Sequence, residues 1–406
     1  MSHKLKKKVS VIGLGYIGLP TAALLASEGF EVMGMDLSQD VVDTINRGEI
    51  QIVEPDLDAY VRSAVARGLL KAATDVSPAD VYILCVPTPF HLTNGEPTAN
   101  IDYVLTAAKS ISSHIKAGDI IILESTSPVG TTALIKNVLA DEKVNVDEIY
   151  IAYCAERVIP GKIMVELVQN DRVIGGVNKE STKAIADFYS NFVQGDILQT
   201  DAKTAEMCKL TENSFRDVNI AFANELSMIC ANSGVDVWEL IKLANHHPRV
   251  NILAPGTGVG GHCIAVDPWF IVSSDRKNSK LIRQAREVND SKPNWVVEHI
   301  VQEAKYLKKD HPKITCLGLS FKPDTDDLRG SPASIVVKSL MDIGLDVSCV
   351  EPNIQNHSNF FITSFDEAIK NSDVIAILVG HKEFKSEANK ELLRNIKVMD
   401  FCGVLS

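Results

Sequence analysis

The chain has 406 residues, of which 45% are hydrophobic and 23% charged, a composition typical of a soluble globular protein with two or three domains. Its formal net charge of −11 argues against broad binding to nucleic acid or to an anionic membrane, because both need a basic face. The eight cysteines include no CxxC pair and no His/Cys cluster with zinc-ligand spacing, so we expect no metal centre and a reducing, cytoplasmic environment.

The N-terminus carries a pattern that superficially resembles a signal peptide. Lysines between residues 4 and 8 precede an apolar run over 9–26. The run contains Gly13-x-Gly15-x-x-Gly18, which favours a strand, a tight turn and a helix instead. In that interpretation Gly13 allows the turn, Gly15 lets the backbone approach a pyrophosphate, and Gly18 lets helix and strand pack closely. We predict no transmembrane segment.

The surrounding pattern predicts a dinucleotide-binding unit rather than a purely structural glycine turn. A buried strand over 9–12 precedes the glycines, a helix pattern runs over 21–28, and a second strand covers 31–35. Asp36 ends that strand, where its carboxylate should accept hydrogen bonds from ribose hydroxyls and repel a 2′-phosphate. The sequence therefore favours NAD over NADP.

Two further buried strands over 81–86 and 120–123 should continue the sheet. Ligands of open α/β sheets lie beyond the carboxyl ends of the strands, where Thr88 and Thr126 follow here. Both are candidates to contact the cofactor, and the alternative is that they are simple turn or cap residues.

A single long helix is predicted over 203–232, with Thr200 and Asp201 to cap its start and Gly234 to end it. About thirty residues at 1.5 Å each span roughly 45 Å. Because that exceeds what a small domain needs, we expect the helix to join two domains and to serve as a dimer face.

Polar residues of this helix fall on one face. Glu206, Lys209, Asn213 and Arg216 follow one another at intervals of three or four. Such a stripe is often only solvated, but apolar residues flank Lys209 and Asn213, which favours a functional face.

A glycine-rich loop over 255–263 carries the most reactive candidate side chain. Its four glycines expose backbone N–H groups and leave Cys263 little cover, which suits a nucleophilic thiolate more than a small apolar filler. The loop alone leaves both readings open. Asp267 shares a face with Cys263 if the stretch opens a helix, and His262 is expected to be a turn residue. The preceding segment 245–251 is a polar turn.

The last quarter predicts a second doubly wound unit, with strands over 314–319, 346–350 and 373–379. A charged loop replaces the glycine motif after the first of them. Lys322 and Arg329 in this loop could bind a nucleotide phosphate, or they could pair with neighbouring aspartates.

Together these motifs resemble those of the UDP-glucose/GDP-mannose dehydrogenase family over essentially the whole chain. The markers are the glycine motif at 13–18, Glu124-Ser125-Thr126, Glu156-Arg157-Val158, Lys209 with Asn213, the segment 260–267, Phe321-Lys322 and Asp326-Asp327-x-Arg329. The resemblance implies two Rossmann-like doubly wound domains of α/β class, joined by a long central helix and a helical middle domain. We expect an NAD-binding domain over 1–200, a dimerisation and catalytic domain over 201–300, and a UDP-sugar-binding domain over 301–406.

Within the family the chain is most similar to enzymes that act on UDP-N-acetyl-D-mannosamine, with UDP-N-acetylglucosamine or UDP-glucose as alternative substrates. The resemblance implies oxidation of the sugar at C6 to a carboxylate with two NAD⁺. Cys263 would add to the aldehyde as thiolate, and the second hydride would leave from the thiohemiacetal to give a thioester. Lys209 would stabilise the oxyanion with support from Asn213, while Asp267 and Glu156 would orient or activate water.

The resemblance also implies two sets of binding residues. Those for the UDP-sugar are Arg157, Val158, Lys209, Asn213, Arg216, His247, Arg249, Gly260, Phe321 and Lys322. Those for NAD are Gly13, Gly15, Tyr16, Ile17, Gly18, Asp36, Thr88, Thr126 and Arg329. One departure is Ala155, where the family usually has proline. We expect a homodimer; the remaining alternatives are a one-step β-hydroxyacid dehydrogenase and a non-catalytic NAD sensor.

Overall fold

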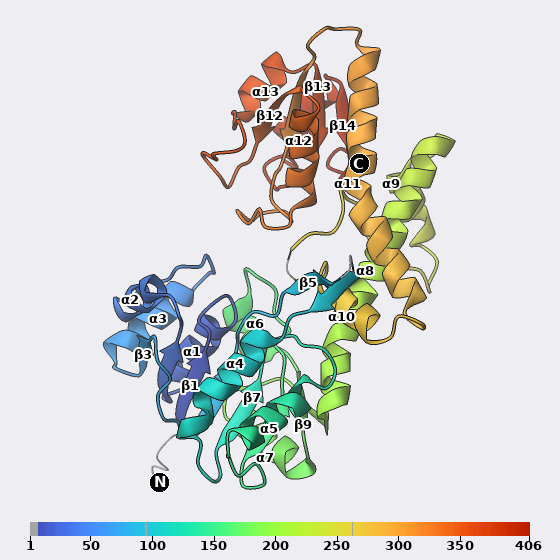
Figure 1. Ribbon diagram of the computed structural model, residues 1–406. Helices are drawn as coiled ribbons and strands as arrows, with labels where there is room; N and C mark the ends of the chain where they lie inside the picture. The colour runs from blue at the N-terminus through green and yellow to red at the C-terminus, as the bar shows by residue number, and fades with distance from the viewer. Residues whose placement is uncertain (1–6, 94–95, 262) are drawn as a thin grey trace. The chain divides into compact units, whose positions relative to one another are not determined.

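The protein was analysed as a computed structural model, which describes residues 7–93, 96–261 and 263–406. The chain forms two compact units, Met1–Glu212 and Asn213–Ser406 (Figure 1). The division falls inside α8 (Ala202–Ser233), the long helix predicted over 203–232. The expected domain boundaries near 200 and 300 stay predictions. No helix of the described residues combines the length and apolar character needed to cross a membrane.

The first unit is built on a mixed sheet of eight strands in the order β10-β9-β8-β7-β4-β1-β2-β3. The strands are β1 (Lys8–Ile12), β2 (Glu31–Met35), β3 (Leu70–Ala73), β4 (Val81–Leu84), β7 (Ile120–Leu123), β8 (Tyr150–Tyr153), β9 (Arg172–Gly176) and β10 (Ile197–Asp201). All neighbours pair in parallel except β8 and β9. A separate antiparallel hairpin joins β5 (Phe90–Thr93) to β6 (Glu96–Ala99).

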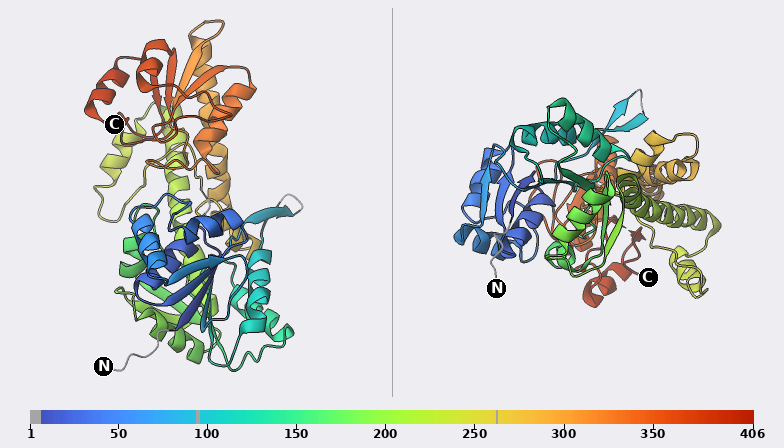
Figure 2. Two further views of the ribbon diagram at one scale, coloured as in Figure 1. Left: turned by 90° about the vertical axis from the view of Figure 1, so that its left-hand side faces the viewer. Right: turned by 90° about the horizontal axis from the view of Figure 1, so that it is seen from below.

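Helices lie on both faces of this sheet, as Figures 1 and 2 show. They are α1 (Gly18–Ser27), α2 (Gln39–Asn46), α3 (Leu57–Ala66), α4 (Asp102–Ile111), a 3₁₀ turn (Ser112–His114), α5 (Thr131–Asp141), α6 (Ile163–Gln169) and α7 (Lys179–Tyr189). Alternate residues of one strand enter different cores: Ile122 packs with α1, α3, α6 and α7, whereas Ile121 and Leu123 pack with α4 and α5. The strands therefore read as unbroken apolar runs.

The second unit contains the C-terminal part of α8, a helical segment and a parallel sheet in the order β12-β11-β13-β14. Its strands are β11 (Lys313–Leu317), β12 (Asp346–Val350), β13 (Val374–Ile377) and β14 (Val398–Asp400). Its helices are α9 (Val237–Ala244), α10 (Asp267–Ser274), α11 (Lys280–Tyr306), α12 (Pro332–Asp342), α13 (Phe365–Asn371) and α14 (Glu387–Arg394). Helices α11 and α12 pack on one face of the sheet, α13 and α14 on the other.

Three predicted strands end earlier than expected, at Leu84, Leu317 and Ile377. The apolar run continues in each case because the chain turns over the end of the sheet while still largely buried. Leu378 and Val379, for example, both donate their N–H groups to the carbonyl of Leu317 rather than extending the ladder. Burial alone therefore overestimates strand length.

Candidate active site

The three glycines of the first βα turn have different surroundings. Gly13 has a φ of +92°, and a Cβ there would lie 2.8 Å from the carbonyl oxygen of Cys85. A Cβ on Gly18 would lie 1.8 Å from the carbonyl oxygen of Gly13. A Cβ on Gly15 would meet nothing within 4 Å, so this backbone borders open space. That cradle fits a pyrophosphate approaching Gly15, at the start of α1.

Asp36 lies where the sequence places it, at the carboxyl end of β2. Its carboxylate accepts hydrogen bonds from the N–H groups of Leu14 and Ser38, both at 3.0 Å. The side chain is half-buried, so it is oriented and still reachable. Tyr16 and Ile17 lie in the turn between Gly15 and the start of α1.

Thr88 and Thr126 lie together beyond the ends of β4 and β7. The hydroxyl of Thr88 donates to the carbonyl oxygen of Thr126 at 2.6 Å. Ser125 donates in the same way to Val86, at 2.7 Å. The bond from Thr88 to Thr126 is the turn role that the sequence left open for Thr88. Both threonines lie at the edge of the sheet where cofactors bind.

Lys209 belongs to a buried cluster of the first unit rather than to a solvated stripe. Its ammonium donates to the carbonyl oxygen of Glu156 at 2.9 Å and lies 3.8 Å from that residue's carboxylate. Both residues are only 8% exposed. Glu156 in turn accepts the N–H of Val158 at 2.6 Å. The predicted oxyanion-stabilising cation thus lies beside one of the predicted water-orienting carboxylates.

The polar residues on this face of α8 have different roles. Glu206 is buried, and its carboxylate accepts the N–H groups of Gly130 and Thr132 at the start of α5. Burial raises the pKa of Glu206, although these bonds oppose the rise. Arg216, by contrast, is exposed. Glu206 is therefore a helix cap, a role that the spacing along α8 did not reveal.

The segment that carries Arg157 and Val158 is held by carboxylates that the sequence did not single out. Glu54 is 5% exposed and accepts the N–H groups of Gly161 and Ile163, each at 2.8 Å. Arg157 forms an ion pair with Glu212 at 2.7 Å. Ala155, the departure from the family pattern, is buried in the core ahead of this segment.

In the second unit, Cys263 is exposed and precedes α10 by one helical turn. Its carbonyl oxygen accepts the N–H of Asp267 at 2.8 Å, so the predicted helical relation between the two residues is confirmed. Asp267 is buried and accepts a hydrogen bond from the side-chain amide of Asn213 at 2.5 Å. The exposure of Cys263 does not fit the alternative of a small apolar filler. His262 lies outside the described residues.

The cysteine loop is anchored along its length. Gly256 donates its N–H to Asn224 at 2.9 Å, and the hydroxyl of Thr257 donates to the carbonyl of Leu378 at 3.2 Å. Gly261 has a φ of +85°, and a Cβ there would lie 2.9 Å from the ring of Phe321. A Cβ on Gly260 would lie 2.5 Å from the carbonyl oxygen of Gly330. The loop therefore packs directly on the segment 320–330.

The segment 320–330 joins β11 to α12 and carries three predicted binding residues. Phe321 and Lys322 are half-buried, whereas Arg329 is exposed and forms an ion pair with Asp327 at 2.7 Å. That ion pair is the alternative that the sequence left open for Arg329. His247 and Arg249 lie exposed in the turn after α9, where the ring of His247 accepts the N–H of Arg249 at 3.3 Å.

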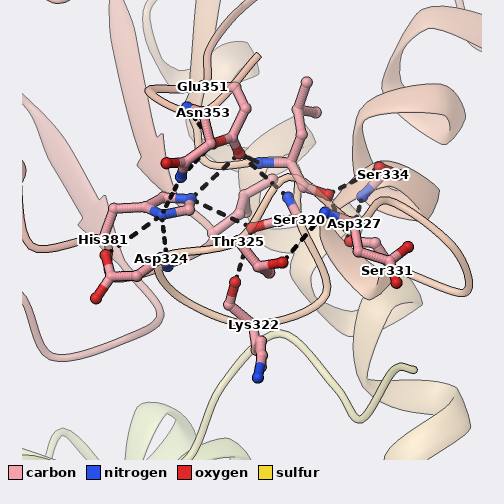
Figure 3. A network of polar contacts seen from close by, with 12 residues as sticks. Ser320, Lys322, Asp324, Thr325, Asp327, Ser331, Ser334, Glu351, Asn353 and His381 are labelled. Carbon is pink, nitrogen blue, oxygen red and sulfur yellow. Dashed lines mark hydrogen bonds and ion pairs between the residues drawn. The ribbon is translucent and has the colours of Figure 1, made fainter. Parts of the chain in front are cut away.

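Behind this segment lies a buried polar network (Figure 3). Glu351 follows β12 and accepts the N–H of Leu319 at 2.8 Å, while His381 contacts Glu351 through Nε2 at 3.2 Å. Burial raises the pKa of Glu351, but the bonds from His381, Leu319 and Asn353 outweigh it and leave the pKa below its usual value. The sequence did not single out Glu351 as a site residue or name His381 at all.

Comparison with known proteins assigns the chain to a family. Residues 7–193 match the NAD binding domain of the UDP-glucose/GDP-mannose dehydrogenase family, residues 203–291 its central domain, and residues 315–406 its UDP binding domain. The chain belongs to this family. It is an NAD-dependent oxidoreductase with NAD as cofactor, and the UDP binding domain indicates a UDP-sugar substrate.

Relatives are similar over nearly their whole length. A UDP-N-acetyl-D-mannosamine dehydrogenase of Campylobacter jejuni is 52% identical, covering 97% of this chain and 99% of the relative. An NDP-N-acetyl-D-galactosaminuronic acid dehydrogenase of Ralstonia nicotianae is 49% identical, with 98% and 96% covered. The solved structure of a UDP-D-ManNAc dehydrogenase from Pyrococcus horikoshii has a TM-score of 0.90 at 36% identity, with 98% and 96% covered. The predicted fold class is confirmed.

Alanine substitutions at Gly15 and Gly18 should separate the two roles of the glycine motif. Gly15→Ala places its methyl group in the open space and should raise the KM for NAD about tenfold or more. Its melting temperature should stay within about 2 °C of the wild type. Gly18→Ala forces the turn apart and should lower the melting temperature and NAD affinity together. Thermal melts and NAD titration check both; equal melting losses would contradict the assignment.

Proposed function

We propose that the enzyme oxidises UDP-N-acetyl-D-mannosamine at C6 to UDP-N-acetyl-D-mannosaminuronic acid, for synthesis of surface polysaccharide. The observation that carries this proposal is the exposed thiol of Cys263, one helical turn before the Asp267–Asn213 pair. A Rossmann site alone explains oxidation of the alcohol to an aldehyde. Oxidation to an acid needs a nucleophile that converts the aldehyde into a second hydride donor.

The chemistry divides among the described side chains. The thiolate of Cys263 adds to the aldehyde carbon to give a thiohemiacetal, whose oxyanion Lys209 stabilises. Loss of the second hydride from that carbon leaves a thioester. Water activated by Asp267 or Glu156 attacks the thioester, the C–S bond breaks, and the acid leaves while the thiolate returns. NAD⁺, held by the residues around Gly15 and Asp36, would supply the acceptor for both hydrides.

Positions of the binding residues support the same assignment. Arg157 and Val158 lie on the segment that Glu54 holds, and Phe321 lies against the cysteine loop. We assign these residues and Lys322 to the UDP-sugar, with His247, Arg249, Arg216 and Gly260 as further contacts. Gly13, Gly15, Gly18, Tyr16, Ile17, Asp36, Thr88, Thr126 and Arg329 are assigned to NAD.

Turnover of a panel of UDP-sugars tests the substrate and the reaction together. We expect preference for UDP-N-acetyl-D-mannosamine and a ratio of two NADH formed per sugar consumed, with the uronic acid identified by mass. The panel includes UDP-N-acetylglucosamine, UDP-glucose and UDP-N-acetylgalactosamine, the last because a 49% identical relative is named for a galactosaminuronic acid. One NADH per sugar would favour a one-step dehydrogenase, and a strong preference for UDP-glucose would overturn the substrate assignment.

We propose a homodimer that uses α8. Phe215, Phe222 and Ile229 are spaced seven residues apart on this helix and are 69%, 52% and 52% exposed. Such a repeat places apolar side chains along one seam, as in paired helices. A size measurement that finds only monomer would contradict this.

The eight cysteines are thiols, which suits the proposed cytoplasmic location.

A further inference from the structure

The turn after β11 repeats the geometry of the turn after β1. Gly13 and Gly318 both have left-handed backbone, with φ of +92° and +91°. Each donates its N–H to the last residue of the neighbouring strand, to Met35 at 2.7 Å and to Val350 at 2.8 Å. The second unit has therefore kept the entry of a dinucleotide-binding turn, although the rest of the glycine motif is absent.

The acidic residue after the second strand is also repeated, but its surroundings differ. Asp36 accepts the N–H of Leu14, and Glu351 accepts the N–H of Leu319 in the same way. Asp36 is half-buried, whereas Glu351 is 4% exposed. The carboxylate that could meet a ribose in the first unit is enclosed by protein in the second.

Partners from the chain itself occupy both oxygens of Glu351. Oε2 accepts the N–H groups of Leu319 and Ser320 and lies 3.2 Å from Nε2 of His381. Oε1 accepts the backbone and side-chain N–H groups of Asn353 at 3.2 and 3.3 Å. Glu351 therefore serves the chain's own structure, and His381 is one of its partners.

The hydrogen bonds of His381 define its tautomer. The backbone N–H of Asp324 points to Nδ1 at 3.0 Å, and because this group can only donate, Nδ1 must be the acceptor. The proton is then on Nε2, directed to Glu351. The ring is 0% exposed, so water does not replace either bond. His381 thus links a rigid strand end to the segment 320–330.

Bonds of this network lie on both sides of Lys322, as Figure 3 shows. On one side, the hydroxyl of Ser320 donates to the carbonyl oxygen of Lys322 at 2.8 Å. On the other, Asp324 has a φ of +61°, a strained value for a non-glycine residue, and its carboxylate accepts the N–H of Lys382 at 3.0 Å. His381 and Lys382 thus restrain the loop at Asp324.

The same region contains three potential metal ligands, Asp324, His381 and Glu383, whose ligand atoms lie within 4.8 Å of one another. A metal ion would need a lone pair of the imidazole. Nδ1 already accepts the N–H of Asp324, and Nε2 carries the proton directed to Glu351. The bonding therefore favours a role in holding the loop over a role in binding a cation.

We propose that the buried pair Glu351–His381 is a positioning device for the UDP-sugar site. It fixes the loop so that Phe321 and Lys322 meet the nucleotide and Phe321 seats the cysteine loop at Gly261. The proposal rests on the proposed function for the roles of Phe321 and Lys322. Neither His381 nor Glu351 touches the substrate in this scheme.

Two substitutions of His381 separate its two bonds. His381→Asn keeps an oxygen near the position of Nδ1 to accept the N–H of Asp324, whereas His381→Gln reaches toward Glu351 and leaves that N–H without an acceptor. We expect His381→Gln to weaken UDP binding and raise the KM for the UDP-sugar about tenfold, the value of one buried hydrogen bond. His381→Asn should lose less. The KM for NAD should not change in either, and the matched control His357→Gln should behave as wild type.

Two substitutions of the exposed residue Asp324 test the same loop without altering the core. Asp324→Asn keeps the side-chain oxygen for Lys382 and tolerates the left-handed backbone, so UDP affinity should be retained. Asp324→Gly removes that restraint and should weaken UDP binding by about threefold to tenfold. Loss of UDP affinity in Asp324→Asn equal to that in Asp324→Gly would favour the cation site and overturn the proposal.

Titration of UDP by calorimetry, with thermal melts, distinguishes this proposal from the proposed function. If the wild type binds UDP but does not oxidise the sugar panel, the proposed function fails and the positioning role is still read from UDP affinity. Unchanged UDP affinity in both His381→Gln and Asp324→Gly would overturn the positioning role. Equal losses of NAD and UDP affinity in all variants would indicate a general folding defect and overturn it as well.

Discussion

Replacing Cys263 with alanine is expected to abolish formation of the uronic acid. Without sulfur the aldehyde cannot be converted into a thiohemiacetal, so the second hydride has no donor. Loss of the nucleophile from a covalent mechanism costs on the order of 10⁶-fold in turnover, so acid should fall below detection. NAD binding should persist, because every residue assigned to NAD except Arg329 lies in the first unit. Product mass and NADH yield give the measurement.

A matched control for this variant is Cys402→Ala. Cys402 also lies in the second unit, but its thiol donates to the carbonyl of Ile377 at 3.5 Å and it packs beside the core. We expect near wild-type turnover from it. Acid formation by Cys263→Ala at two NADH per sugar would remove the sulfur from the mechanism. Complete loss of NAD binding would instead mean that the variant had misfolded.

Replacing Lys209 with methionine should lower kcat by about 10²–10³-fold, the usual cost of removing one stabiliser of a developing oxyanion. Methionine keeps the apolar stem in the buried site but supplies no charge and no donor for the carbonyl of Glu156. The KM for NAD should change little. Single-turnover measurements with the UDP-sugar separate the chemical step from release of product.

Lys203→Met is the control on the same helix, because Lys203 is exposed and lies six residues before Lys209. Its expected kcat is that of the wild type. If Lys209→Met kept full kcat and raised only the KM for the sugar, Lys209 would be a binding residue that acts equally on substrate and transition state. That result would reassign the oxyanion role to another donor.

Local patterns in the sequence predicted most of the framework. Apolar runs bounded by turns indicated β1, β2 and β7, and the long helix was expected within one residue of each end of α8. The glycine motif, the position of Asp36 and the relation of Cys263 to Asp267 could also be predicted. Each depends on residues that are close in sequence or lie within one βαβ unit. These features depend on the backbone, whose conformation the local sequence largely determines.

Contacts between distant segments could not be predicted from the sequence. Glu54 holds Gly161 from 107 residues away, Glu206 caps α5 from 76 residues away, and His381 meets Glu351 across 30 residues. Each is a buried polar side chain whose partner is a backbone N–H or a carboxylate of another element. One sequence carries no signal for the identity of such a partner, because it depends on the tertiary fold.

Gly261 and Phe321 pack closely against each other. The glycine has left-handed backbone, and the phenyl ring lies only 2.9 Å from where a Cβ on Gly261 would be. A larger residue at 261 is tolerated only if 321 becomes smaller, and even then the backbone strain remains. Positions 261 and 321 should therefore change together in evolution, and attempts to alter the enzyme's specificity through Phe321 will behave as epistatic with the glycine rather than as independent steps.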